Sequence, residues 1–405
     1  MNTLPRPEVL ALNASRIREV ANAGIGLDGI LPFWFGEPDR PTAQFIRDAA
    51  RDSLAAGETF YSHNLGLPTL RATLSRYLGT LHGRAIGADS IVVTSSGVNA
   101  LMIVHQALTS PADRVVVVTP VWPNLTEAPR ILGAHVVRVA LDFDAGRGWT
   151  LDLDRLLAAL VPGTRTLVVN SPNNPTGWTL SAGQQQVLLA HCRKLGIWIV
   201  ADDVYERIWF GADTAAGQTC APSFLDIAEP GDRVISTNSF SKAWRMTGWR
   251  LGWFVAPPDF VEQCGKLLEY NTSCAPVFVQ RAGIEAVEHG EAELRAELVR
   301  YRTARDHLAE RLALIDGVDA PAAPGAMYAF FRMAGMGDSV EYCKRLVREQ
   351  RLGLAPGSAF GPEGDGFVRW CFASDVALID DGLERFARLR AAPTAAPRET
   401  AATSS

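Results

Sequence analysis

The stretch Asn238–Trp253 reads NSFSKAWRMTGWRLGW and places one lysine, Lys242, among small hydroxyl side chains. Arg245 and Arg250 follow within eight positions, next to an apolar run that contains tryptophan. Lysine side chains are rarely buried without a reason. A lysine with little water around it and a cation nearby has a lowered pKa, and its amine becomes nucleophilic toward a carbonyl. The stretch therefore predicts a reactive lysine that points into a crevice at the end of a strand.

Short apolar runs, rich in β-branched residues, alternate with helix-like segments on both sides of this stretch. Near-continuous apolar strands of this kind are typical of a mostly parallel sheet that helices cover on both faces. We expect strands at Ile91–Thr94, Arg114–Thr119, His135–Val139, Thr166–Asn170, Ile197–Ala201, Arg233–Thr237 and Leu251–Ala256. We expect helices between them at Val98–Leu108, Asn124–Leu132, Leu153–Leu160 and Ser181–Lys194. The pattern predicts an α/β fold.

The character of the chain changes after Pro276. Residues 280–314 are charged and helix-forming, with a break near His289–Glu291. Later segments predict a smaller α+β domain, with strands at Met327–Arg332 and Phe367–Phe372 and helices at Ser339–Glu349 and Asp380–Arg390. We expect an N-terminal arm and part of the small domain at 1–45, a large cofactor-binding domain at 46–290 and the rest of the small domain at 291–392. The low-complexity tail at 393–405 is expected to be disordered.

The composition is that of a globular protein: of 405 residues, 47% are hydrophobic and 20% are charged, and the formal net charge is −5. Without a dense basic block, neither nucleic acid nor a membrane surface is expected as a partner. The six cysteines are scattered without a C-x-x-C pair, which indicates thiols in a reducing compartment and no metal site. The start of the chain lacks a signal-peptide pattern, and no apolar run approaches the roughly 20 residues of a bilayer span. We expect a cytoplasmic protein.

One glycine-rich motif matches a dinucleotide-binding loop in sequence but not in its predicted structural context. Residues Gly24–Gly29, GIGLDG, match the pattern G-x-G-x-x-G. A dinucleotide-binding loop of this kind follows a strand and opens a helix. Here the motif follows the helix-like stretch SRIREVANA and precedes LPFW. We therefore expect no nicotinamide cofactor at this motif.

Three polar segments follow predicted strands and would meet at the carboxyl edge of the sheet, where open α/β sheets bind ligands. Thr94–Asn99 leaves a strand and enters a helix, so its backbone N–H groups suit an anion. Ser171–Gly177, SPNNPTG, is a rigid polar loop that suits an amide donor. Asp202 and Asp203 follow an apolar strand. An ordinary turn, or a helix cap in the case of the aspartates, explains each segment when it is taken alone.

Taken together with Lys242, these segments supply the groups that pyridoxal phosphate requires. The lysine amine suits its aldehyde, the loop before the helix suits its phosphate, and Asp202 suits its pyridinium nitrogen.

Six motifs resemble those of the class I/II aminotransferases, which are fold type I enzymes that use pyridoxal 5'-phosphate. They are FGEPD at 35–39, YSHNLGLPTLR at 61–71, NSPNNPTG at 170–177, ADDVYE at 201–206, NSFSKAWRMTGWRLGW at 238–253 and FVRWCFA at 367–373. The motifs keep the family's order and span about residues 15–390, and the S-x-x-K…G-W-R-x-G block with N-N-P-T-G upstream is the most specific of them. The resemblance implies a large domain with a mostly parallel seven-stranded sheet covered by helices. It also implies a smaller α+β domain built from the N-terminal segment and the C-terminal third.

The resemblance also implies a role for each residue around the cofactor ring. Lys242 would form a Schiff base with the cofactor and then move the α-proton as general base and acid. Asp202 would pair with the pyridinium nitrogen, and Tyr205 and Asn174 would hold the phenolic oxygen of the ring. Trp122 would stack on the ring. The catalytic set implied in this way is Lys242, Asp202 and Tyr205.

The phosphate and the substrate are implied to bind at the two ends of the same site. Backbone N–H groups of Gly97 and Val98, together with Ser239 and Arg250, would bind the phosphate. Substrate binding is implied for residues from three motifs, namely Gly36, Asn174 and Arg369. Of these, Arg369 would bind the substrate α-carboxylate in a bidentate pair, which suits its planar fork of donors.

The family's active site lies between two subunits, so the resemblance implies a homodimer with shared active sites. Tyr61 would reach the phosphate of the neighbouring subunit. The implied reaction moves the amino group of an L-α-amino acid to a 2-oxo acid. Two alternatives share the cofactor and stay open at this point: a lyase, and an oxygen-using amino acid oxidase or hydroxylase. A regulator that borrows the fold is disfavoured, because only about 30 residues precede Gly36 and the chain is not basic.

Departures from the family pattern concern the side chain of the substrate. Some members bind a distal carboxylate with an arginine of the neighbouring subunit, but Tyr270–Ser273 contains none. Others use a lysine just after the phosphate-loop glycine, where this chain has Val98. Leu125 replaces a histidine that some members place near the ring. Arg40 is expected to be a surface residue, although it could reach an acidic side chain, and Arg245 is interpreted as structural.

Overall fold

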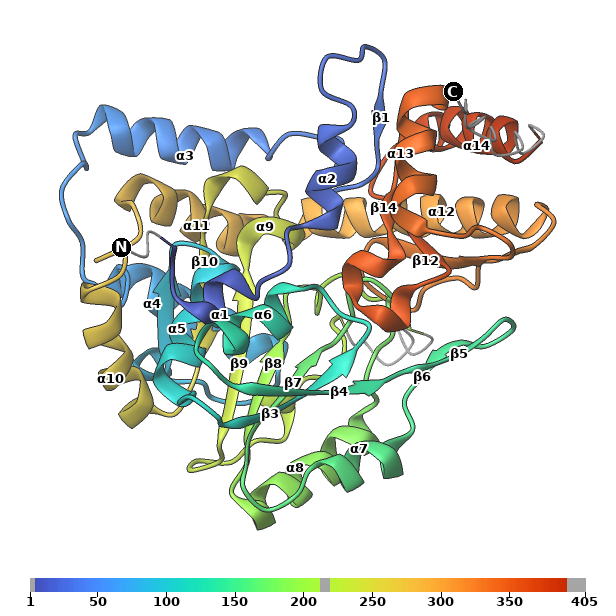
Figure 1. Cartoon of the computed structure of the whole chain (residues 1–405). Coiled ribbons are helices and arrows are strands. Elements are labelled where there is room, and N and C mark those ends of the chain that lie inside the picture. Colours follow the sequence, from blue (N-terminus) through green and yellow to red (C-terminus); the bar gives the residue numbers. More distant parts are fainter. Residues whose placement is uncertain (1–3, 212–218, 392–405) are drawn as a thin grey trace.

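The computed structural model describes residues 4–211 and 219–391 (Figure 1). The tail expected at 393–405 lies outside these residues. A central sheet with helices on both faces is built from the middle of the chain, and a smaller sheet belongs to the C-terminal third. The structure is therefore the expected combination of an α/β part and an α+β part.

The central sheet has seven strands in the order β2-β10-β9-β8-β7-β3-β4. Strand β10 is antiparallel to both of its neighbours, and the other pairs are parallel. The strands are β2 (Ile91–Thr94), β3 (Arg114–Thr119), β4 (His135–Ala140), β7 (Thr164–Asn170), β8 (Trp198–Asp202), β9 (Val234–Ser239) and β10 (Gly252–Val255). All strands predicted for this sheet are confirmed, with bounds that differ by at most two residues.

Strand β3 shows why its sequence is continuously apolar. Val115 and Val117 face a cluster that includes helices α5 (Gly97–Leu108), α6 (Asn124–Ile131) and α10 (Pro258–Glu269). Val116 and Val118 face the other side of the sheet, where α7 (Leu153–Ala159) and α8 (Ala182–Leu195) pack. Towards β2 this second face is covered by α3 (Gln44–Ala55), α4 (Pro68–Leu81) and α11 (Val277–His289). Both faces of the strand are therefore buried, as its composition predicts.

The smaller sheet has the order β11-β12-β15-β14, and its paired strands are antiparallel. It consists of β11 (Val318–Asp319), β12 (Tyr328–Met333), β15 (Phe367–Cys371) and β14 (Ala355–Pro356). The accompanying helices are α12 (Glu291–Ala313), α13 (Ser339–Gln350) and α14 (Val376–Ala391). The N-terminal segment joins this part: α2 (Arg16–Asn22) packs on the same core, and β1 (Leu31–Pro32) pairs with β13 (Leu352–Gly353). We keep the domain boundaries after residues 45 and 290 as a proposal.

The predicted break near His289–Glu291 is confirmed, because α11 ends at His289 and α12 begins at Glu291. A Cβ atom on the intervening Gly290 would lie 2.2 Å from the carbonyl oxygen of Ala286 and 2.8 Å from Trp244. Only glycine fits this close approach between the two helices. Helix α14 begins four residues before the predicted Asp380, at Val376.

Among the elements that were not predicted are α1 (Pro7–Leu10), the hairpin of β5 (Asp142–Asp144) and β6 (Gly148–Thr150), the two-residue strands of the small domain, and the helices α3, α4 and α10. None of the helices within the two described ranges combines the length and the apolar composition that a membrane-spanning helix needs.

Candidate active site

A cavity of about 450 Å³ opens at the carboxyl ends of β7, β8 and β9, beside the N-terminus of α5. Every predicted site residue except Tyr61 lines it. Those residues are Gly36, Gly97, Val98, Trp122, Asn174, Asp202, Tyr205, Ser239, Lys242, Arg250 and Arg369. The cavity thus brings together residues that are more than 300 positions apart in the chain.

Lys242 lies in the short helix α9 (Phe240–Ala243), which begins directly after β9. Its amine donates a hydrogen bond to the carbonyl oxygen of Gly36 at 2.5 Å and lies 5.9 Å from the ring centre of Tyr205. Burial lowers the pKa of Lys242 to about 8, and the positive charge of Arg369 acts in the same direction. The neutral, nucleophilic form of the amine is therefore much more populated near neutral pH than in an exposed lysine.

Asp202 ends β8 and points into the cavity from a buried position. Its carboxylate accepts a hydrogen bond from the backbone N–H of Val204 at 3.3 Å, and no cation pairs with it in the described part of the chain. Burial raises the pKa of Asp202 to about 7. Asp203, the next residue, faces away and accepts hydrogen bonds from Ser236 at 2.6 Å and Ser223 at 3.0 Å. Of the two aspartates, Asp202 is the one available to a cationic ligand.

Arg369 is buried in β15 between the rings of Tyr328 and Phe360, whose centres lie 4.3 and 4.8 Å from its guanidinium carbon. It donates to the side-chain oxygen of Asn174 at 2.8 Å and to the carbonyl oxygen of Trp34 at 2.5 Å. Its Nε is buried without a hydrogen-bond partner in the structure. A buried donor left without a partner is costly, so this group suits an anionic ligand.

The other end of the cavity is built for an anion. Gly97 and Val98 begin helix α5, where backbone N–H groups point outward. The hydroxyl groups of Ser239 and Ser241 lie 2.9 Å apart, and Arg250 lines the same wall. A Cβ atom on Gly97 would lie 3.1 Å from the Cβ atom of Ser239, so the glycine keeps this end of the cavity open.

Comparison with known proteins identifies the family. Residues 29–386 match the family model for aminotransferase class I and II. The chain belongs to this family. It is 30% identical over 380 residues to an aspartate aminotransferase of Pyrococcus horikoshii, covering 93% of this chain and 95% of the relative. It is 31% identical to an aspartate aminotransferase of Thermotoga maritima, covering 86% and 88% of the two chains.

Solved structures agree with this assignment. The aspartate aminotransferase from Thermus thermophilus with maleate has a TM-score of 0.86 at 30% identity, covering 96% of this chain and all of the other. An alanine aminotransferase from Pyrococcus furiosus has a TM-score of 0.88 at 22% identity, which supports the fold. This class I/II aminotransferase is a pyridoxal-phosphate-dependent enzyme that exchanges amino groups between amino acids and 2-oxo acids.

The cavity of this aminotransferase fits its cofactor. A buried carboxyl group without a cation faces a position for the pyridinium nitrogen, and an amine with a lowered pKa lies in the same cavity. The helix N-terminus and the serine hydroxyl groups suit the phosphate. Ring, aldehyde and phosphate each have a matching group among Asp202, Lys242 and the residues at the start of α5.

Tyr328 and Arg18 had no functional signal in the sequence, whereas Asn170, Phe35 and Glu37 stand within the motifs NSPNNPTG and FGEPD without an assigned role. The hydroxyl groups of Tyr328 and Tyr205 share a hydrogen bond of 2.6 Å. The side-chain oxygen of Asn170 accepts a hydrogen bond from the backbone N–H of Asn174 at 2.7 Å. Arg18, Phe35 and Glu37 also line the cavity. Tyr328 lies in a correctly predicted strand, but no local pattern indicates which of its residues faces the site.

The remaining sequence predictions have mixed outcomes. Tyr61 is 90% exposed and lies outside the cavity, so its role toward a neighbouring subunit stays a prediction. Arg40 does not line the cavity, and its half-exposed side chain pairs with Asp375 at 3.2 Å, which agrees with the expected surface position. The motif at Gly24–Gly29 lies in the turn between α2 and β1, away from any strand-to-helix junction.

Proposed function

We propose that Lys242 holds the cofactor covalently and transfers the α-proton of an L-α-amino acid during its conversion to a 2-oxo acid. The observation that carries this proposal is the position of the Lys242 amine, in one cavity with the Asp202 carboxyl and the Arg369 guanidinium. When bound, pyridoxal phosphate supplies an electron sink for the charge that develops at Cα.

The cofactor would be held from several elements at once. Asp202 would keep the pyridine nitrogen protonated, because an opposite charge at close range favours the ionised carboxylate. Tyr205 and Asn174 would hydrogen-bond the phenolic oxygen, and Trp122 would stack on the ring. Gly97, Val98, Ser239 and Arg250 would bind the phosphate through the anion-binding end of the cavity.

Arg369 would bind the α-carboxylate of the substrate, with Gly36 and Asn174 beside it. Binding would satisfy the unpaired Nε of Arg369, and a bidentate pair would fix the orientation of Cα relative to Lys242. Orientation of this kind can supply several kcal/mol of a barrier, up to about 7–11 kcal/mol in favourable cases. Because burial lowers its pKa to about 8, the Lys242 amine can accept the α-proton once Arg369 has oriented the substrate.

Part of the cavity wall suits a neutral side chain on the amino donor, because Ile17, Phe35, Val98 and Leu101 contribute apolar surface. Arg18 lines the same cavity, and within the described ranges it has no carboxylate partner. Arg369 and Arg250 have roles toward the α-carboxylate and the phosphate. We therefore assign Arg18 to the distal carboxylate of a dicarboxylic 2-oxo acid that accepts the amino group.

We also propose a cytoplasmic homodimer in which Tyr61 contributes to the partner's phosphate site. The 90% exposure of Tyr61 supports this, since tyrosine is on average a partly buried residue and a partner subunit would cover this ring.

A panel of half-reactions tests the proposed function. Purified protein is incubated with one amino acid at a time, and the cofactor spectrum and the released product are followed. We expect conversion of the cofactor to its amine form with stoichiometric release of a 2-oxo acid. Release of ammonia or consumption of oxygen, without the amine form, would overturn the proposal.

A further inference from the structure

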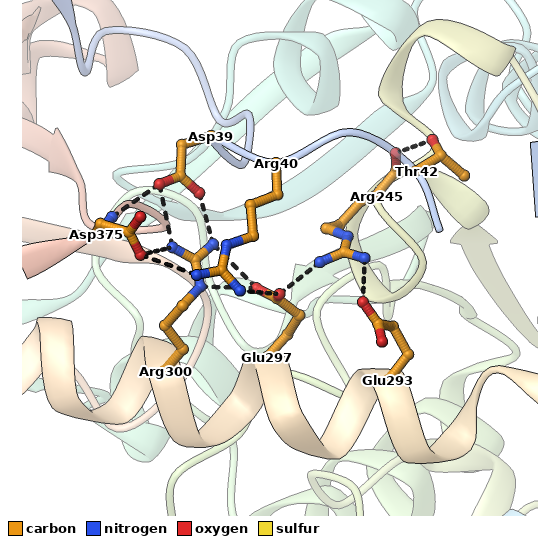
Figure 2. Close-up of polar contacts among 8 residues, drawn as sticks. All are labelled: Asp39, Arg40, Thr42, Arg245, Glu293, Glu297, Arg300 and Asp375. Carbon is orange, nitrogen blue, oxygen red and sulfur yellow. Dashed lines mark hydrogen bonds and ion pairs between the residues drawn. The ribbon is translucent and has the colours of Figure 1, made fainter. Parts of the chain in front are cut away.

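Eight residues around the start of helix α12 form a continuous polar network, here named the α12 cluster (Figure 2). Its members are Asp39, Arg40, Thr42, Arg245, Glu293, Glu297, Arg300 and Asp375. They come from four separate segments of the chain, and only Glu293, Glu297 and Arg300 belong to α12 itself.

Glu297 is the centre of the cluster, and only 5% of its side chain is exposed. Arg245 donates to its Oε1, and Arg300 donates to its Oε2 at 3.0 Å. Arg40 lies 3.6 Å from the same Oε1. Three guanidinium groups therefore converge on one buried carboxylate, and Arg245 makes a second contact with Glu293 (Figure 2).

The segments tied to this cluster are those that carry the substrate-facing groups of the site. Arg245 comes three residues after Lys242, Asp39 comes three residues after Gly36, and Asp375 comes six residues after Arg369. Arg300 binds the carboxylates of Asp39 and Asp375 together, at 2.5 and 3.0 Å.

Two further bonds join these segments directly. The backbone N–H of Asp375 donates to Asp39 at 2.8 Å, and the hydroxyl of Thr42 donates to the carbonyl oxygen of Arg245 at 2.6 Å. The Lys242 segment, the Gly36 segment and the Arg369 segment are thus all fixed to the first turns of one helix.

The backbone of Arg245 adopts an unfavourable conformation that surrounding contacts must hold in place. Its φ is +54°, in the left-handed region that a non-glycine residue rarely adopts, and it is only 8% exposed. Such a conformation persists when surrounding contacts hold it. Here those contacts are Thr42 at the backbone and two glutamates of α12 at the side chain. The bend that follows Lys242 therefore depends on α12.

We propose that the α12 cluster is a positioning device for the reaction, with Arg245 and Glu297 as positioning residues. It sets the distance between the Lys242 amine and the carboxylate-binding Arg369 by fixing both segments to one helix. The idea rests on the proposed roles of Lys242 and Arg369. A misplacement of about 1 Å by a distant mutation can cost about 100-fold in rate, so such a device has measurable consequences.

A charge-neutral double variant, Arg245→Met with Glu297→Gln, tests the proposal. Each single variant removes one member of a buried ion pair, although Glu297 keeps Arg300 and Arg40, and Arg245 keeps Glu293. We expect a lowered melting temperature for each single variant. The double variant removes both members, and we expect it to recover most of that loss. Its kcat should nevertheless stay at least about 10-fold below that of the unaltered enzyme.

Two readouts separate positioning from stability. With L-glutamate deuterated at Cα, the kinetic isotope effect should increase in the double variant, because proton transfer becomes more rate-limiting. Without any substrate, amide hydrogen exchange should be faster in peptides that cover 36–42 and 243–247. The exchange measurement does not require activity, so it remains informative if the enzyme proves to catalyse another reaction.

The matched control is Arg193→Gln with Asp232→Asn. This pair is equally close, with two bonds of 2.6 Å, but it lies near the amino end of β8, opposite the site. We expect its kcat within about twofold of the unaltered enzyme. Arg245→Lys, which keeps the charge, should recover part of the lost kcat and serves in place of the double variant if that variant does not fold. A stable double variant with unchanged kcat and isotope effect contradicts the proposal, as does an Arg245→Lys variant that recovers nothing.

Discussion

Lys242 and Asp202 are both driven toward their neutral forms, because burial disfavours each charge. The pKa of Lys242 falls to about 8 and that of Asp202 rises to about 7. In the proposed mechanism, the lowered pKa makes the amine reactive, and the Asp202 carboxyl would ionise beside a protonated ring nitrogen. An opposite charge then favours the ionised carboxylate. The two residues acquire these properties from their places at the ends of β9 and β8.

The rate at which cofactor-free protein captures pyridoxal phosphate should therefore increase through about pH 8. Below the pKa of Lys242 the amine is protonated and unreactive, and above it the neutral form dominates. Because Arg369 contributes to the lowered pKa, Arg369→Met should move the midpoint to higher pH. Stopped-flow absorbance measures this profile. A midpoint near the ordinary lysine value of about 10.4 would rule out a buried reactive amine.

Replacement of Arg18 should change the choice of amino acceptor. Arg18→Leu is expected to lower kcat/KM for 2-oxoglutarate by about 10- to 100-fold, since a hydrogen bond to a charged group contributes about 1.5–3 kcal/mol. For pyruvate, which has no distal carboxylate, the change should stay within about threefold. Arg16→Leu on the same helix is the control, because Arg16 does not line this cavity. Equal losses for both acceptors would remove Arg18 from the specificity pocket.

At the level of elements, the site depends on strand ends and helix starts. Strands β7, β8 and β9 deliver Asn174, Asp202 and Lys242 to one edge of the sheet, and α5 brings its N-terminus to the same place. The junction of α11 and α12 matters equally, because α12 supports the segments around the site. Gly290 lets the chain pass from one helix to the next beside Trp244.

A side chain at this junction should destabilise the protein. Gly290→Ala is expected to lower the free energy of unfolding by about 1–3 kcal/mol, because the added Cβ meets Ala286 and Trp244 at less than contact distance. Gly183→Ala in α8 is the comparison, since a Cβ there has open space. It should be neutral or stabilise by up to about 1 kcal/mol. Urea denaturation measures both, and equal effects of the two variants would show that the junction tolerates a side chain.

For the molecule as a whole, apolar periodicity was sufficient to predict the central sheet, because buried parallel strands have a composition of their own. Most residues that line the cavity were predicted through motifs that stand beside strand ends. Tyr328 and Arg18 were not, because their proximity to the site comes from packing of the N-terminal segment and the small sheet against the cavity. The cluster around Glu297 was invisible for the same reason: its members lie up to 336 positions apart.

The proposed homodimer is a property of the whole molecule. We expect light scattering to give the mass of a dimer, with Tyr61 near the partner's site. Tyr61→Phe should then weaken cofactor affinity by about 10-fold through loss of a hydrogen bond to a charged phosphate. A nearby substitution, Phe60→Leu, is the control, because Phe60 is also exposed but has no hydroxyl group. Fully active monomers would contradict the shared site.

If Lys242 holds the cofactor covalently, the small number of lysines in the chain makes the attachment site simple to locate. The chain contains only four lysines: Lys194, Lys242, Lys266 and Lys344. Reduction of the loaded enzyme with borohydride, followed by peptide mapping by mass spectrometry, locates the modified residue. We predict the cofactor mass on the peptide with Lys242 and on no other. Stoichiometric modification of another lysine, or no modification of a fully active enzyme, would contradict covalent attachment of the cofactor at Lys242.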